Sequence, residues 1–69
     1  MATDRRVQAT VKVLDHVQRA REALKEFSAD GARTHGVLAN PRLQCTSLKW
    51  AQEELQRAIV IIQQTKWRS

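Results

Sequence analysis

The chain has 69 residues, a formal net charge of +5 and a single cysteine, Cys45. A chain this short buries only about 60% of its unfolded surface, so we expect residues 1–69 to form one domain that needs an additional source of stability. One cysteine excludes an intrachain disulfide, and His16 and His35 are too few and too widely spaced to predict structural zinc. Self-association is the remaining source.

No stretch of the sequence approaches the ~20 apolar residues that a membrane-spanning helix needs. The N-terminal residues lack the apolar core of a signal peptide, because Lys12 and Asp15 interrupt it. We therefore expect a cytoplasmic protein. Its positive charge alone would suit nucleic acid, an anionic membrane or an acidic protein; the sequence as a whole favours a protein partner, without a membrane, cofactor, metal or small-molecule substrate.

The first element is a helix expected over about residues 4–29, a stretch without glycine or proline. Thr3 or Asp4 can cap its start, and Gly31 suits the left-handed position after its end. Its apolar residues cover an arc of about 200°, whereas an ordinary surface helix shows a stripe little wider than about 100°. One neighbouring helix cannot cover that arc, so part of it is expected to form a dimer core; the candidates are Val7, Val11, Leu14, Val17 and Leu24.

A loop is expected over about residues 30–40, which is longer than the ~2–8 residues usual between helices of a bundle. Val37 and Leu38 are expected to fold over the end of the hydrophobic core. Arg33 and His35 are expected to remain exposed, and they are candidate contact residues of the loop.

A second helix is expected over about residues 41–67, because Asn40 followed by Pro41 is typical of a helix start. Its main apolar stripe is predicted to pack on the first helix and consists of Leu48, Ala51, Leu55, Ala58, Ile59 and Ile62. The apolar run at 59–62 extends beyond one stripe, which indicates that more than one face of this helix is buried.

These elements predict an all-α fold, an antiparallel hairpin of two long helices that dimerises into a four-helix bundle. Two alternatives stay open. The apolar surface of both helices could be covered in a three-helix or larger assembly, or the chain could be a monomer whose second face is covered only when a partner binds.

Catalysis is not expected, so the chain is predicted not to be an enzyme. A nucleophile needs a neighbouring base and a group that orients the base; Cys45 and His35 have no visible third member. His16, at the border of the apolar arc, is expected to be a partly buried structural residue. The carboxylates are expected in exposed ion pairs four residues apart, namely Asp15–Arg19 and Glu53–Arg57.

The second helix carries the candidate partner-binding surface. Trp50, Glu54, Arg57 and Ile61 are expected on one line away from the core stripe, with Val60 and Trp67 beside it. Tryptophan and arginine are enriched at the residues that dominate binding energy. The alternative is that Trp50 and Ile61 form the dimer seam. A pair between Arg21 and Glu54 across the dimer is a further hypothesis.

In an antiparallel hairpin both chain ends meet, which gathers a basic end of Arg5, Arg6, Lys66 and Arg68. Such a cluster beside a tryptophan could contact phosphates and bases, or it could simply increase solubility. The sequence favours a small protein-binding regulator, an inhibitor, anti-activator or adaptor that occupies a surface of a larger protein through a helix face. The alternatives are a nucleic-acid-binding accessory protein and a structural subunit of a larger assembly.

Overall fold

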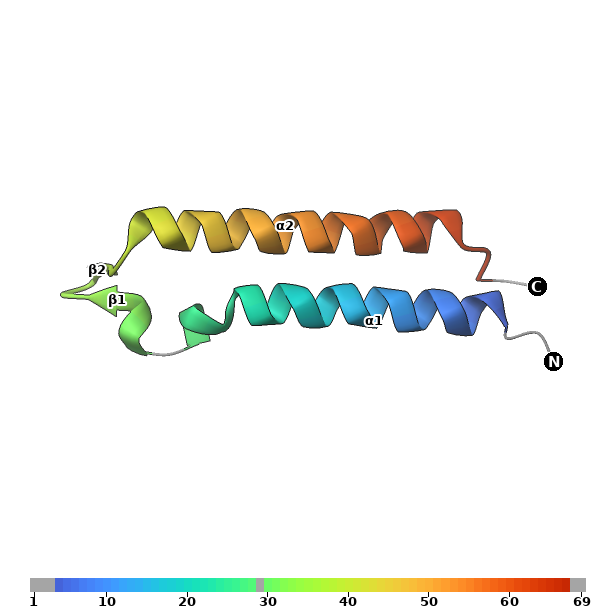
Figure 1. Cartoon of the computed structure of the whole chain (residues 1–69), viewed down its shortest axis with the longest axis horizontal. Helices are drawn as coiled ribbons and strands as arrows, with labels where there is room; N and C mark the ends of the chain where they lie inside the picture. The colour runs from blue at the N-terminus through green and yellow to red at the C-terminus, as the bar shows by residue number, and fades with distance from the viewer. Residues whose placement is uncertain (1–3, 29, 68–69) are drawn as a thin grey trace.

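The computed structural model describes residues 4–28 and 30–67 of the chain. Two α-helices dominate it: α1 spans Arg5–Ala23 and α2 spans Pro41–Gln64. They lie antiparallel and side by side, with both termini at the same end (Figure 1). The rod measures 55 × 17 × 15 Å, which is one pair of helices thick. The prediction of an all-α helical hairpin is confirmed.

Helix α1 begins at its cap and ends earlier than expected. The Asp4 carboxylate accepts a hydrogen bond of 2.8 Å from the backbone N–H of Arg6. At the other end, the Leu24 N–H is shared between the carbonyl groups of Ala20 and Arg21. This tightening leads into two short 3-10 turns, Lys25–Ser28 and Asp30–Ala32. The expected continuation of an α-helix to about residue 29 is therefore wrong, and Thr3 lies outside the described residues.

The loop contains a small β-hairpin formed by β1, Arg33–Thr34, and β2, Val37–Leu38. Both residues at its tip have positive φ, His35 at 55° and Gly36 at 83°, as a two-residue type I′ turn requires. The side chains of Val37 and Leu38 are 66% and 52% exposed. The expectation that they cover the end of the core is wrong, because the hairpin extends beyond the helices instead of folding back over them (Figure 1).

Helix α2 begins where the sequence places it, with Asn40 as its cap and Pro41 in its first turn. The most buried side chain of the described residues is Gln44, which ties the loop to this helix start. Its amide oxygen accepts from the Asn40 N–H at 3.0 Å and its amide nitrogen donates to the Ala32 carbonyl at 2.6 Å. At the end of α2, a side chain also supplies a hydrogen bond to a backbone carbonyl group: Nε1 of Trp67 donates to the Ile62 carbonyl.

The seam between α1 and α2 consists mainly of small and polar residues. Its register is marked by a contact of 2.7 Å between His16 and Glu54, which also brings Ala20 level with Ala51. The buried or half-buried positions recur at alternating steps of three and four residues, the repeat of helices that pack side by side. The seam residues are Ala9, Val13, His16, Ala20 and Ala23 on α1, Gln44, Ser47, Ala51, Glu54, Ala58 and Ile61 on α2, and Thr65 directly after α2.

This seam corrects the predicted core stripe of α2. Ala51 and Ala58 are buried as expected, but the large side chains of the stripe lie outside the seam. Alanine permits the two helix axes to approach closely, so little room remains between them for leucine or isoleucine. The displaced residues are between 41% and 49% exposed, and they are Leu48, Leu55, Ile59 and Ile62.

Candidate functional surfaces

The seam divides the surface of the hairpin into two faces of different chemistry. Residues that directly follow a seam position turn to one side on both helices, because the helices have the same hand and run antiparallel. This side also carries Thr10, Arg21, Cys45 and Gln52. Its apolar residues, with Val7 and Val11 beside them, are the apolar face: Val7, Val11, Leu14, Val17, Leu24, Leu48, Leu55, Ile59 and Ile62. Residues that directly precede a seam position form the Trp50 face: Gln8, Lys12, Asp15, Arg19, Glu22, Leu43, Thr46, Trp50, Glu53, Arg57, Val60 and Gln64, with Glu26 beyond Glu22.

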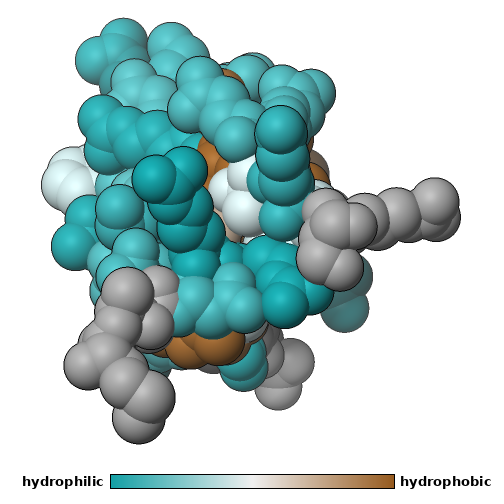
Figure 2. Space-filling model, turned by 90° about the vertical axis from the view of Figure 1, so that its right-hand side faces the viewer, coloured by the Kyte–Doolittle hydropathy of each residue, from teal (hydrophilic) through white to brown (hydrophobic). Residues whose placement is uncertain are grey.

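The apolar face contains the five residues that the sequence proposes as a dimer core. Val7, Val11 and Leu14 are more than half exposed, and Val17 and Leu24 are half-buried. At the end of the molecule where the termini lie, hydrophobic surface emerges between hydrophilic side chains (Figure 2). Large aliphatic groups from both helices thus remain in contact with solvent in the single chain.

The Trp50 face contains a groove next to the exposed indole. The groove has a volume of about 430 Å³, and its walls come from both helices: Gln18, Arg19, Glu22 and Ala23 on α1 and Thr46, Ser47 and Trp50 on α2. Trp50 is 60% exposed. Trp50 was identified from the sequence, but Glu22, Ala23 and Thr46 were not. Once the small residues of the seam are recognised, these three residues can be placed beside the predicted partner-binding line.

A polar layer crosses the middle of the seam, formed by the buried Glu54, the half-buried His16 and the exposed Arg57. Nδ1 of His16 donates to Oε2 of Glu54, and the guanidinium of Arg57 lies 3.2 Å from the other carboxylate oxygen. The hydrogen bond from His16 lowers the pKa of Glu54, with Arg57 adding to the effect, while removal of the carboxyl from water acts in the opposite direction. The structural role expected for His16 agrees with this geometry.

The layer changes the interpretation of the predicted partner-binding line. Glu54 is 5% exposed, so it belongs to the seam and is not an accessible contact residue. Ile61 is a half-buried seam residue, whereas Trp50, Arg57 and Val60 remain exposed. Arg57 pairs with Glu54 and not with Glu53, but the predicted pair Asp15–Arg19 is present at 3.1 Å.

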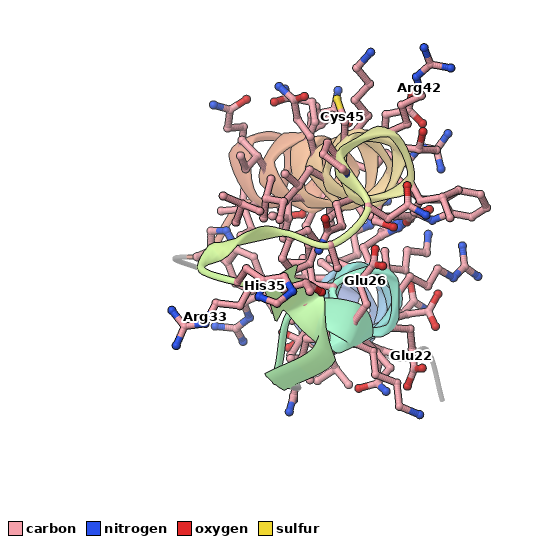
Figure 3. All side chains as sticks on the ribbon, turned by 90° about the vertical axis from the view of Figure 1, so that its left-hand side faces the viewer. Glu22, Glu26, Arg33, His35, Arg42 and Cys45 are labelled. Carbon is pink, nitrogen blue, oxygen red and sulfur yellow. The ribbon has the colours of Figure 1, made fainter. Side chains whose placement is uncertain are left out.

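Three remaining predictions concern Trp67, Arg21 and the loop. Trp67 is 40% exposed and donates to the last turn of α2, apart from the line of Trp50. Glu54 is already bound by His16 within the chain, which removes the basis for an Arg21–Glu54 pair across a dimer. In Figure 3 Arg33 and His35 extend from the loop on the side opposite to Glu22 and Glu26, and Cys45 points away from α1.

The basic end is only partly assembled. Arg5 and Lys66 line one hollow together with Gln64 and Thr65. Arg6 forms an ion pair of 2.9 Å with Asp4, so its charge is locally balanced. Arg68 lies outside the described residues. Among the described members of the cluster, Arg6 is therefore the one whose charge is offset within the chain.

Residues 4–28 and 30–67 include no group of three or more histidine, cysteine or acidic side chains arranged to hold a metal ion. Within the same ranges, neither helix is long and apolar enough to cross a membrane. No family model matches the chain, and comparisons with curated proteins and with solved structures also found no similar protein.

Proposed function

We propose that the protein is a small, non-catalytic regulator that binds another protein and acts by occupying its surface. The observation that carries the proposal is the amount of surface that the hairpin leaves uncovered. The chain exposes 6085 Å², whereas a compact chain of 7.9 kDa is expected to expose about 4,400 Å². The surplus of roughly 1,700 Å² is about twice the ~800 Å² that each partner contributes to a standard interface.

A second copy of the chain is the cover that we propose for the apolar face. The face is two helices wide, so an identical face related by a two-fold axis gives a four-helix bundle. Leu14, Leu55 and Ile59 would then leave water. Full burial of an exposed side chain of this kind stabilises by about 1.5–3 kcal/mol; since these three are between 41% and 60% exposed, covering them contributes about half of that each, which a domain of this size needs.

The Trp50 face remains outside in that arrangement and is the surface that we assign to the regulated protein. Trp50 and the side chain of Arg57 are each 60% exposed. Both belong to residue types that dominate binding energies, and the charged residues around them suit the rim of an interface. Occupation of a partner's surface is a mode of action that fits a narrow rod with these two side chains exposed on one face.

Nucleic-acid binding is the second candidate, because Arg5 and Lys66 line one hollow at the end of the rod where α1 begins and α2 ends. The salt dependence of the binding affinity distinguishes the two candidates. Binding through phosphates weakens steeply as salt is added, whereas an interface anchored by Trp50 loses less affinity.

The experiment for the main proposal places a photo-reactive amino acid at position 50 in cells, with position 56 as the matched control. Gln56 is an exposed residue of α2 that belongs to neither the seam nor the two faces. We expect a crosslink to one other protein from position 50 and none from position 56. The purified partner's activity should then change and saturate as the wild-type chain is added, and should not change with Trp50→Ala.

Self-crosslinks alone from position 50 would contradict the proposal, because Trp50 would then lie in the dimer seam. Crosslinks that disappear after nuclease treatment would favour nucleic-acid binding.

A further inference from the structure

The side of the seam that carries the apolar face has the same spacing of residues on both helices. Positions on this side recur at alternating steps of three and four residues. They are Val7, Thr10, Leu14, Val17 and Arg21 on α1, Leu24 at its C-terminal cap, and Cys45, Leu48, Gln52, Leu55, Ile59 and Ile62 on α2. This spacing reads the same in both directions, so the face of a second copy can be matched to it with the loops at the same end or at opposite ends.

The midpoints of the two sets of positions lie at one level of the rod. The midpoint is between Leu14 and Val17 on α1 and between Gln52 and Leu55 on α2. In the register of the seam, these midpoints differ by only about one residue, or ~1.5 Å along the rod. A two-fold axis perpendicular to the rod at this level therefore lays the whole face on its copy and places the loops at opposite ends.

Opposite ends give the better chemical match between the two copies. In this arrangement α1 lies against α1 of the partner subunit, and α2 lies against α2. Arg21 then faces Thr10 of the partner subunit, and Gln52 faces Leu55 beside the axis. The other pairs are aliphatic on both sides, and they include Val7 with Leu24, Leu14 with Val17 and Leu48 with Ile59.

With the loops at the same end, α1 lies against α2 of the partner subunit and the match is poorer. Every polar residue of α1 on this side then faces an aliphatic residue, and so does Gln52. A polar group that loses water without gaining a hydrogen bond costs free energy, so the order of residues favours opposite ends. The mismatched pairs are Arg21 with Leu48, Thr10 with Ile59 and Gln52 with Val17.

Charge favours the same choice. Arg21 and Lys49 are exposed and lie at one level in the register of the seam. Loops at the same end would bring these cations of both copies to one level of the bundle, and like charges across an interface are unfavourable. Loops at opposite ends place Arg21 instead at a hollow of about 410 Å³ at the start of α1, whose lining includes Asp4 and Thr10. Arg6 lines the same hollow but is paired with Asp4, so its charge is already offset there.

The position of the loop adds a steric reason. In Figure 3 Arg33 and His35 extend on the side opposite to Glu22. Glu22 belongs to the Trp50 face, so the loop extends on the side of the apolar face. Two loops at the same end would meet where the faces join, whereas at opposite ends each loop lies beyond the helices of the partner subunit.

We propose that two copies pair through their apolar faces with the loops at opposite ends of a four-helix bundle, and that Arg21 of each copy enters the hollow at the start of α1 of the other. The inference rests on the second copy that the proposed function assigns to the apolar face. It adds the direction of that copy and the residue that each copy contributes to the other. It does not depend on which protein binds the Trp50 face.

The test uses the single cysteine of the full chain, Cys45, which is exposed. In the proposed dimer the two Cys45 residues lie roughly 25 Å apart along the rod, whereas with the loops at the same end they would lie at one level. A short bis-maleimide should therefore leave wild-type chains without a crosslink on a denaturing gel. Mass spectrometry should show the reagent attached to Cys45 through one maleimide, which excludes an unreactive thiol.

The variant Gln63→Cys supplies the positive result. Gln63 is exposed near the end of α2, at the level that Cys45 of the partner subunit occupies in the proposed dimer. We expect the bis-maleimide to convert this variant into covalent dimers. The two thiols of one chain lie roughly 27 Å apart along the same helix, which excludes a link within the chain. The matched control is Gln64→Cys, whose thiol lies on the Trp50 face and should give no covalent dimers.

The variant Arg21→Gln tests the residue that each copy contributes. It should raise the Kd of the dimer roughly threefold to tenfold, since exposed contacts of this kind are individually weak and two are lost per dimer. Lys49→Gln removes a cation from the same level without removing a proposed contact, and should leave the Kd unchanged. A tighter dimer for both variants would overturn the proposal, because the cations of the two copies would then face each other.

Solution mass is recorded for every variant before the crosslinking reaction. Covalent dimers from the wild type, or none from Gln63→Cys while its mass is that of a dimer, would overturn the inference and leave the proposed function intact. A wild-type monomer at every concentration would overturn the inference together with the dimer. The regulator itself is tested separately by the crosslink from position 50 to another protein, and the absence of that crosslink would remove the proposed function without affecting the direction of the dimer.

Discussion

The seam between the helices and the apolar face differ in a way that reverses the usual arrangement of a small protein. The seam is closed by alanines and by the pair that the half-buried His16 forms with the buried Glu54. The apolar face carries leucine, isoleucine and valine and remains open to solvent. Among the apolar side chains of the described residues, the fully buried ones are therefore the small alanines, whereas most of the large ones are exposed.

The difference shows that two kinds of interaction stabilise two levels of structure. Close approach of the helix axes and one polar layer define how α1 and α2 pair, since a buried polar layer can fix the register of packed helices. The large side chains contribute little to that pairing. Their contribution becomes available when another molecule covers them.

Enlarging the seam should have the largest effect on the hairpin. Ala51 lies level with Ala20, and both are 3% exposed, so the variant Ala51→Leu forces the helices apart. Overpacking of this kind costs about 1–3 kcal/mol, a large part of the ~3–5 kcal/mol that a domain of this size can have. We expect the free energy of unfolding, measured in urea by circular dichroism, to fall by about 1–3 kcal/mol.

The matched comparison for Ala51→Leu is the variant Gln56→Leu on the outer surface of α2, which should change the free energy of unfolding by less than about 0.5 kcal/mol. Leu55→Ala, measured in dilute monomer, should cost less than the ~2–5 kcal/mol of a buried leucine, because Leu55 is 41% exposed. If Ala51→Leu remained stable and Leu55→Ala unfolded, the account would be contradicted, because the apolar face and not the seam would then stabilise the hairpin.

The polar layer should make stability depend on pH. The hydrogen bond from His16 holds the pKa of Glu54 below its ordinary value of 4.5. The folded pKa is the lower one, so this contribution is complete above about pH 4.5 and is lost as the pH falls through the folded pKa. Urea midpoints between pH 7 and pH 3 should fall for the wild type, and Glu54→Gln should be less stable at pH 7 and fall less.

A second carboxyl contributes in the same direction and needs its own control. The hydrogen bonds from Arg6 lower the pKa of Asp4 from its ordinary value of 3.8. The variant Asp4→Asn retains an acceptor at the helix cap while it removes this titration. If Glu54→Gln leaves the acid slope unchanged and Asp4→Asn removes it, the seam layer is not the main origin of the pH dependence.

At the loop end of the seam, Gln44→Leu should have a moderate effect. The change keeps an apolar stem but removes both hydrogen bonds that join α2 to Asn40 and Ala32. Partly buried groups left without partners cost about 1–3 kcal/mol. Thermal unfolding should show a lower midpoint, with faster hydrogen exchange in the loop. An unchanged midpoint would mean that the hydrogen bonds of Gln44 do not stabilise the loop end of the seam.

The smallest effect is expected at the tip of the loop, which belongs to neither region. Gly36 has φ of +83°, and no heavy atom lies within 4 Å of a Cβ placed there. The variant Gly36→Ala therefore meets only the backbone penalty of the left-handed conformation, about 1 kcal/mol. The free energy of unfolding measures it. A larger loss would indicate that the tip contacts another part of the assembly.

Sequence analysis predicted the hairpin and the start of α2 because these depend on local signals, the Asn40–Pro41 pair and the absence of glycine and proline from the helices. It failed at the end of α1, since the change to 3-10 turns after Ala23 has no glycine or proline to mark it. It failed for Val37 and Leu38 because two apolar residues were assigned to the core on hydropathy alone.

The candidate surfaces were only partly predictable for a related reason. A search for the most apolar stripe of α2 selects Leu48, Leu55 and Ile59, which face away from the seam. The alternating repeat of Ala51, Glu54 and Ala58 was present in the sequence, but it includes a carboxylate. Burial of Glu54 becomes acceptable only once His16 of the other helix is known to lie beside it.

The most direct test of the central claim is the absolute mass in solution, measured by light scattering behind a sizing column over a wide range of concentration. The wild-type chain should have a mass close to twice 7.9 kDa. Leu14→Glu/Leu55→Glu should give a folded monomer, and Gln56→Glu should remain a dimer. A wild-type monomer at every concentration, or a double variant that is still a dimer, would contradict the claim that a second copy covers the apolar face.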